Sequence, residues 1–177
     1  DKLFIRIIFA ALILGTLYRL LPIALGQQAL SEMFTTEDGY LMLTVARNMA
    51  IGLGMSVSEG TIGTNGVQPL ATYIFTLPYI LTGGDKVTSL IGIHLISAAI
   101  ALAAAFAVRA FAARVLNRQD SNPLWPWLVA ALWFVGPLLL RHSMNALETG
   151  LYTLCTLLAL LWFYRVLEKG SAAGMGD

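Results

Sequence analysis

Charged residues are scarce in this chain of 177 residues. Asp, Glu, Lys and Arg together make up 12% of it, whereas about a quarter is usual in soluble domains. Hydrophobic residues make up 58%, and the mean hydropathy is +0.75. This composition excludes an ordinary soluble domain and indicates a protein embedded in a lipid bilayer.

Cysteine, net charge and familiar enzyme motifs are also lacking. Cys155 is the only cysteine, so an intrachain disulfide is excluded. The formal net charge is +1, and the basic residues stand at the ends of apolar runs, which argues against a nucleic-acid partner. The sequence contains no P-loop, dinucleotide fingerprint, HExxH, CxxC or nucleophile elbow, so the common chemistries of soluble enzymes have no support.

Long apolar runs predict an all-α, polytopic membrane bundle that forms a single domain over residues 1–177. A spanning helix needs about 20 apolar residues, and we predict four spans, over 3–25, 87–112, 124–142 and 148–167. The first run lacks a convincing signal-peptide cleavage site and is interpreted as a retained anchor. Within the spans, we expect Arg6 and Arg19 to snorkel to the two membrane surfaces and His94 to form an interhelical hydrogen bond.

The basic residues predict the orientation of the chain. With four spans, six basic residues near the span ends fall on the same side, which the positive-inside rule makes cytoplasmic; they are Lys2, Arg109, Arg114, Arg118, Arg165 and Lys169. Five spans would put the basic linker "RAFAARVLNRQ" outside, which violates the positive-inside rule. Residues 26–86 then form an external loop with interfacial helices over about 38–52 and 67–82, and we predict a multi-pass protein of the plasma membrane whose functional loop faces outward.

The stretch "TTEDGYLMLTVARNMAIGLG" opens this loop with two carboxylates, Glu37 and Asp38. Helical spacing puts Leu41, Met42 and Val45 on one apolar face, and Asp38 leads that face. An unpaired carboxylate is costly there unless it looks into a cavity. The alternative is that Asp38 caps the helix and Glu37 interacts with its dipole. Both interpretations remain open.

Two further polar stretches lie at membrane boundaries. "RHSMNALETG" brings together Arg141, His142, Asn145 and Glu148, although interfacial anchoring and a helix-start carboxylate would also account for them. "GTNGVQPL" contains Thr64, Asn65 and Gln68, and turn chemistry would explain that stretch equally well. Carboxylates and cations at a bilayer surface suit transfer from a lipid-linked phosphate, because a carboxylate can act as general base and a cation can offset charge on the departing phosphate.

The sequence contains the stretch "EDGYLMLTVARNMAIGLGMSVSEGTIGTNGVQPL", followed by two long apolar segments and then by "MNALETGLY". This set of features resembles the N-terminal part of integral-membrane GT-C glycosyltransferases. These are relatives of the protein O-mannosyltransferases and of the aminoarabinose and arabinofuranose transferases. The resemblance covers about residues 3–167. The chain departs from what is usual in this family at three places: the family often has a second Asp where this chain has Glu37, an aromatic residue where it has Ala71, and a Gly before Met where it has Asn145 and Ala146. Because family members have more spans and a C-terminal external domain, we expect this chain to be the front part of a larger GT-C module.

The resemblance implies an inverting transfer from a polyprenyl-phosphate-linked sugar donor to an acceptor hydroxyl. Asp38 would be the base, Glu37 the second choice, and Glu148 would orient the acceptor or hold a divalent metal where the enzyme uses one. We expect the lipid phosphate to bind at Arg141, His142 or Lys86. The residues expected to line the sugar site are Thr64, Asn65, Gln68 and Asn145.

Two other functions fit the same sequence. In one, the chain is a non-enzymatic membrane scaffold subunit that packs with further membrane subunits, and the acidic pair is a helix cap. In the other it is a small transporter, for which His94 and Ser97 are the polar groups within the membrane.

Overall fold

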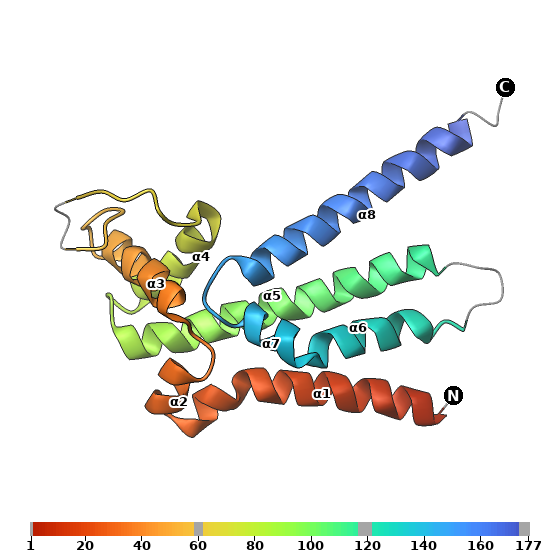
Figure 1. Cartoon of the computed structure of the whole chain (residues 1–177), viewed down its shortest axis with the longest axis horizontal. Helices are drawn as coiled ribbons and strands as arrows, with labels where there is room; N and C mark the ends of the chain where they lie inside the picture. Colours follow the sequence, from red (N-terminus) through yellow and green to blue (C-terminus); the bar gives the residue numbers. More distant parts are fainter. Residues whose placement is uncertain (1, 59–61, 117–121, 174–177) are drawn as a thin grey trace.

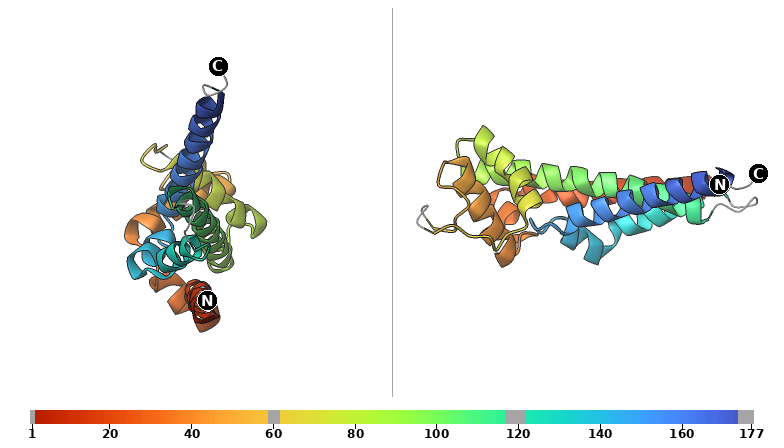
Figure 2. Two further views of the ribbon diagram at one scale, coloured as in Figure 1. Left: turned by 90° about the vertical axis from the view of Figure 1, so that its right-hand side faces the viewer. Right: turned by 90° about the horizontal axis from the view of Figure 1, so that it is seen from above.

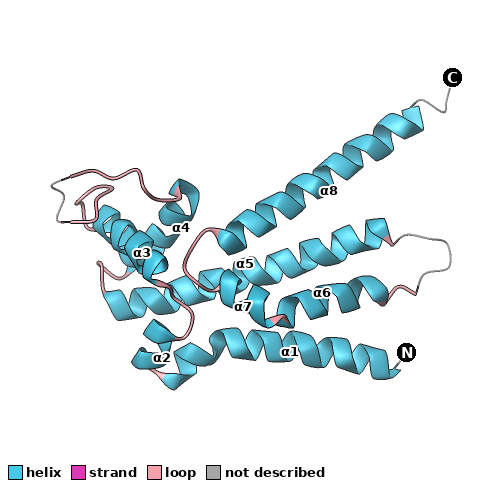
Figure 3. Ribbon diagram, in the orientation of Figure 1, coloured by secondary structure: helices cyan, strands magenta, loops and turns pink. Residues whose placement is uncertain are grey.

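The computed structural model describes residues 2–58, 62–116 and 122–173, and within these ranges the regular structure is helical, with no strand (Figure 3). The helices are α1 (Lys2–Leu25), α2 (Gln27–Glu32), α3 (Glu37–Ala50), α4 (Pro69–Leu81), α5 (Lys86–Val115), α6 (Trp125–Val135), α7 (Pro137–Ser143) and α8 (Thr149–Ala173). The expected all-α bundle is therefore confirmed.

The molecule is elongated, with its long helices roughly along one axis (Figures 1 and 2). Helices α2, α3 and α4 gather at one end. The start of α1 and the ends of α5 and α8 lie at the other end (Figure 1). The three shorter helices that follow α1 are thereby separated from the end of the bundle at which the chain starts and finishes.

Helix α5 is the centre of the bundle and contacts α1, α4, α6 and α8. Asp85 caps its N-terminus by accepting a hydrogen bond from the Thr88 N–H at 2.8 Å, and these contacts with Thr88 hold the pKa of the Asp85 carboxyl below its usual value. Small residues fill the buried face of α5: Ala101 and Ala105 form a cluster with Phe134 of α6. Small side chains allow helix backbones to approach closely, as is common between helices in membranes.

Three helices are long and apolar enough to cross a bilayer: α1, α5 and the Thr149–Lys169 part of α8. The fourth expected span, 124–142, differs from the prediction of one continuous helix, because it consists of α6 and α7 separated at Gly136. Pro137 has no N–H to donate to the preceding turn and its ring crowds that turn, so it ends α6 and begins α7. A total of four crossings therefore stays a prediction.

Arg19 lies inside the bundle, so the prediction that it snorkels is wrong. Its side chain has 0% exposure. Its Nη1 donates to the carbonyl oxygens of Gly15 at 3.0 Å and Phe134 at 2.9 Å, and its Nη2 donates to Ser143 Oγ at 3.3 Å. The guanidinium also lies over the Phe134 ring, with Cζ 3.9 Å from the centroid. The break between α6 and α7 leaves acceptors inside the bundle, and Arg19 binds them instead of reaching the surface.

His94 also differs from its prediction. Its Nδ1 lies 2.9 Å from the Leu90 carbonyl oxygen, one turn earlier on α5, so the bond is within the helix and not between helices. Nε2 is buried and has no hydrogen-bond partner among the described residues. The ring lies near Phe34, with centroids 6.3 Å apart. The carbonyl of the preceding turn is within easy reach of a helical side chain, which is why the local bond forms.

Candidate functional site

The acidic pair stands in the first turn of α3, directly after the residue that caps this helix. The cap is Thr36, whose Oγ1 accepts a hydrogen bond from the Gly39 N–H at 3.2 Å. The alternative in which Asp38 is the cap is therefore wrong. Both Glu37 and Asp38 are exposed, and within the described ranges neither carboxylate makes a hydrogen bond or an ion pair. Both remain free to interact with a ligand while the helix dipole favours their negative charge.

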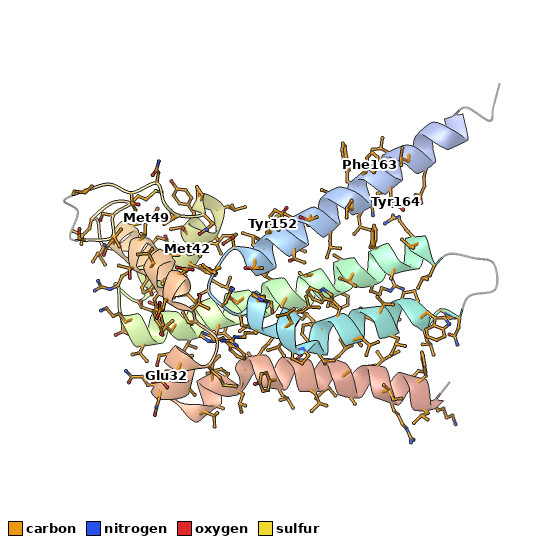
Figure 4. All side chains as sticks on the ribbon, in the orientation of Figure 1. Glu32, Met42, Met49, Tyr152, Phe163 and Tyr164 are labelled. Carbon is orange, nitrogen blue, oxygen red and sulfur yellow. The ribbon has the colours of Figure 1, made fainter. Side chains whose placement is uncertain are left out.

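The buried face of α3 is turned slightly from the one that the sequence predicts. Met42, Val45 and Ala46 are buried, whereas Leu41 is 46% exposed. Met42 and its neighbours pack into the cluster that α3 forms with α4 and α5 (Figure 4). Packing against α4 orients α3 in this way, and Asp38 is exposed beside the packed face.

The start of α3 lies against the segment 144–148, which precedes α8. A Cβ atom built on Gly39 would lie 2.3 Å from the Asn145 carbonyl oxygen and 3.3 Å from the Ala146 Cβ. The Thr36 N–H donates to the same Asn145 oxygen at 3.5 Å. Ala146 belongs to the core cluster that contains Met42. Two stretches that are far apart in sequence, each with a carboxylate, thus meet at one place.

The segment 144–148 is a tight turn held by Asn145. The Asn145 side chain is 4% exposed; its Oδ1 accepts a hydrogen bond from the Leu147 N–H at 3.1 Å, and its Nδ2 donates to Thr149 Oγ1 at 3.5 Å. Ala146 adopts a positive φ of 60°, which is uncommon outside glycine and indicates a backbone constrained by its surroundings. Asn145, expected at the sugar site, directs its polar atoms into this turn.

Glu148 ends the turn immediately before α8. Its side chain is partly buried, and its Oε2 is a buried atom with no hydrogen-bond partner among the described residues. A buried carboxylate oxygen without a partner costs free energy. A ligand that supplies a donor or a cation would offset this cost, so Glu148 is the best-placed carboxylate for such a contact.

The contact at Gly39 can be tested by Gly39→Ala. Because the new Cβ would collide with the Asn145 carbonyl oxygen, we expect the free energy of unfolding to fall by about 2 kcal/mol, in spite of the higher helix propensity of alanine. Thermal unfolding of the purified protein in detergent measures this. Gly63→Ala is the matched control, since its Cβ would come no nearer than 3.9 Å to another heavy atom. Equal stability of the two variants would contradict the close contact.

An apolar cavity of about 730 Å³ lies between α1, the residues after α2, and the break between α6 and α7. Tyr18, Phe34 and Leu140 line it, and Arg141 is the charged residue among the described residues of its wall. Its volume is within the range of ligand pockets. His142 follows Arg141 on α7 and is exposed. Arg141 is therefore beside an apolar space, as binding of a lipid phosphate requires.

Lys86 lies in a different pocket, so the three phosphate candidates do not converge. That pocket, of about 280 Å³, is lined by residues of α3, α4 and α5 that include Tyr40, Arg47, Tyr79 and Lys86. Arg47 is held there by donating from Nε to the Gly84 carbonyl oxygen at 2.7 Å. Burial raises the pKa of Tyr79 to about 12, so this phenol keeps its proton at neutral pH. Arg47 was not selected from the sequence as a site residue, although it stands in the stretch "TTEDGYLMLTVARNMAIGLG" that the acidic pair opens.

Thr64 and Asn65 belong to a loop attached at the far end of α3. The Thr64 N–H donates to the Met55 carbonyl oxygen at 2.8 Å, and Asn48 Nδ2 donates to the Ser56 carbonyl oxygen at 2.8 Å. Asn48 is ten residues after Asp38, which corresponds to about 15 Å along an α-helix. The loop is therefore anchored well away from the acidic pair.

Gln68 is closer to the segment 144–148. It is the residue before α4, and its carbonyl oxygen accepts a hydrogen bond from the Thr72 N–H at 3.0 Å. Ala71, in the first turn of α4, lines one small pocket with Leu147 and Gly150. Of the three residues expected from this loop, Gln68 is the one next to a helix that shares a pocket with the start of α8.

Within the described ranges, no group of three or more His, Cys, Asp or Glu residues gathers closely enough to hold a metal ion. We compared the chain with protein-family models, with curated proteins and with solved structures, and found no match in any of the three.

Proposed function

We propose that this chain is the front part of a GT-C type membrane glycosyltransferase, which transfers a sugar from a polyprenyl-phosphate donor to an acceptor hydroxyl. The observation that carries the proposal is the contact between the start of α3 and the segment 144–148. This contact brings the free carboxylates of Glu37 and Asp38 and the unsatisfied Oε2 of Glu148 to one end of the molecule.

In the proposed reaction, the acceptor oxygen attacks the anomeric carbon as the bond from that carbon to the phosphate oxygen breaks. Asp38 takes the proton of the hydroxyl, and the polyprenyl phosphate leaves with the electron pair of the broken bond. Attack from the face opposite the leaving phosphate inverts the anomeric configuration. Glu148 positions the acceptor.

The apolar cavity supports a donor with a hydrocarbon tail. An isoprenoid chain would occupy the space beside Tyr18 and Phe34, with its phosphate toward Arg141. A cation at that place offsets the charge that develops on the departing phosphate. Lys86, in its separate pocket, does not take part in this arrangement.

Five of the basic residues support an external position for the site. Lys2 is in the first turn of α1, Arg109 and Arg114 are in the last turns of α5, and Arg165 and Lys169 are in the C-terminal half of α8, at the end of the bundle opposite α3 (Figure 1). The positive-inside rule makes that end cytoplasmic. The acidic pair then faces outward from the plasma membrane, where polyprenyl-phosphate sugars meet external acceptors.

The proposal is tested by Glu148→Gln. We expect transfer of a labelled sugar from a polyprenyl-phosphate donor in native membranes to fall about 10- to 100-fold, because the amide keeps the shape but loses the charge. Glu32→Gln on α2 is the control, since that carboxylate is exposed and bonds only Gln28 Nε2, at 3.3 Å, among the described residues. Transfer by Glu148→Gln at the normal rate would contradict the role of Glu148.

The scaffold function has one observation in its favour. None of the residues in the most apolar 18-residue window of α8 is buried within the described part of the molecule. Such a helix offers its surface to lipid or to other membrane subunits. If wild-type membranes show no transfer with any polyprenyl-phosphate sugar, while α8 can be cross-linked to another membrane protein, the scaffold function replaces the enzymatic one.

A further inference from the structure

A crevice of about 470 Å³ lies between the C-terminal parts of α5 and α8, at the end of the bundle opposite the acidic pair. The two helices diverge toward this end (Figure 1). Its lining residues are Arg109, Ala110, Ala113, Arg114, Arg165 and Glu168. The two alanines leave room between the helices, and charged side chains surround that room.

The crevice has an excess of positive charge. Three arginines face one carboxylate, and Arg114 Nε lies 3.8 Å from Glu168 Oε1, with the two side chains 24% and 60% exposed. An ion pair with this separation, between side chains that reach solvent, contributes little to stability. Arg109 and Arg165 make no ion pair with any described residue. Two guanidinium groups are therefore available to an anion.

Arg109 provides the clearest sign of a missing ligand. Its Nε is a buried atom with no hydrogen-bond partner within the described ranges. Its Cζ lies 5.0 Å from the centroid of the Trp127 ring on α6, which holds the guanidinium in place. Buried donors are nearly always satisfied in folded proteins, so an acceptor from outside the chain is expected here.

Apolar surface borders the crevice. Val115 on α5 and Val166 and Leu167 on α8 are all about half exposed. Deeper between the helices, Phe111 and Tyr164 meet edge to face with centroids 5.7 Å apart. Tyr164 faces α5 while Phe163 points outward (Figure 4). A ligand with an anionic head and hydrocarbon tails would match both the charge and the apolar border.

We propose that this crevice binds the phosphate group of an anionic phospholipid, with Arg109 and Arg165 as its ligands and the acyl chains along the exposed faces of α5 and α8. Basic pockets between membrane helices on the cytoplasmic side are suited to such head groups, and guanidinium groups bind phosphate oxygens in pairs. The site is independent of sugar transfer, since its residues lie at the opposite end from Asp38.

Native mass spectrometry of the purified full chain in detergent, titrated with phosphatidylglycerol or with phosphatidylcholine, tests the proposal. We expect phosphatidylglycerol to bind at least tenfold more tightly. Arg165→Gln should weaken its binding about fivefold, and Arg109→Gln with Arg165→Gln about 25-fold, because each cation near an anionic lipid contributes roughly a factor of five. Arg165 is exposed and makes no ion pair with a described residue, so its single variant should fold normally.

The matched control is Lys2→Gln with Arg6→Gln, which removes two exposed cations from the same end of the bundle. It should change phosphatidylglycerol binding by less than twofold. An equal loss in this control pair would show diffuse attraction and overturn the site. Equal binding of phosphatidylcholine would do the same. Displacement of the lipid by millimolar inorganic phosphate would assign the crevice to a free anion instead.

Discussion

Asp38→Asn is expected to abolish sugar transfer, with a fall in rate of about 10³-fold, because a positioned general base contributes a factor of 10² to 10⁴. The amide has the shape of the carboxylate but does not accept the hydroxyl proton. Asp38 is exposed and free of hydrogen bonds to described residues, and Thr36 caps α3. The variant should therefore insert and fold as the wild type does. Initial rates with a labelled polyprenyl-phosphate sugar, normalised to protein in the membrane, measure the effect.

Glu37→Gln separates the two neighbours. Glu37 stands beside Asp38 in the same exposed turn, so the two variants make the same chemical change under the same conditions. We expect Glu37→Gln to keep transfer within about fivefold of wild type. If Glu37→Gln is the inactive variant, the base is Glu37. If both variants transfer normally, neither carboxylate is the base and the enzymatic proposal loses its main support.

Arg19→Ala is expected to lower the free energy of unfolding by about 3–5 kcal/mol, because it removes a large buried side chain and leaves buried acceptors without a donor. Arg19 joins α1 to the carbonyl of Phe134 on α6 and to Ser143 on α7, on either side of the α6–α7 break. Its loss should loosen the α6–α7 break as well as α1. Unfolding of the purified protein by a denaturing detergent, followed by circular dichroism, measures the change.

Arg6→Ala is the control for this prediction. Arg6 lies on the same helix and carries the same charge, but it is exposed, so its removal should change stability by no more than about 0.5 kcal/mol. Arg19→Lys should give an intermediate result, since a single ammonium does not reproduce the forked contacts of a guanidinium. Equal stability of Arg6→Ala and Arg19→Ala would contradict the buried role of Arg19.

Apolar length and helix signals predict much of the fold. The long helices α1 and α5 begin and end within a few residues of the expected spans, and Pro69 begins α4 as its sequence position suggests. The break at Gly136 was not predicted, although Pro137 stands in the middle of the expected span. A proline in an apolar run permits either a kinked helix or two helices, and the choice depends on neighbours such as Arg19.

The site depends more on contacts between distant residues. Glu37, Asp38 and Glu148 can be selected from the sequence because carboxylates are rare beside apolar runs. Their approach depends on Gly39 fitting against the Asn145 carbonyl, a contact that no local pattern encodes. The same limit explains Lys86 and Arg141, which look alike in sequence but line separate pockets.

Helix α8 is expected to form before it docks against the rest of the bundle. None of the residues in its most apolar window is buried against described parts of the chain, so lipid rather than protein sets the stability of this helix in a bilayer, where its backbone hydrogen bonds are all internal. Such a helix forms on insertion and docks afterwards. Hydrogen exchange in detergent should therefore show the amides of α8 opening without the rest of the bundle, as a separate cooperative unit.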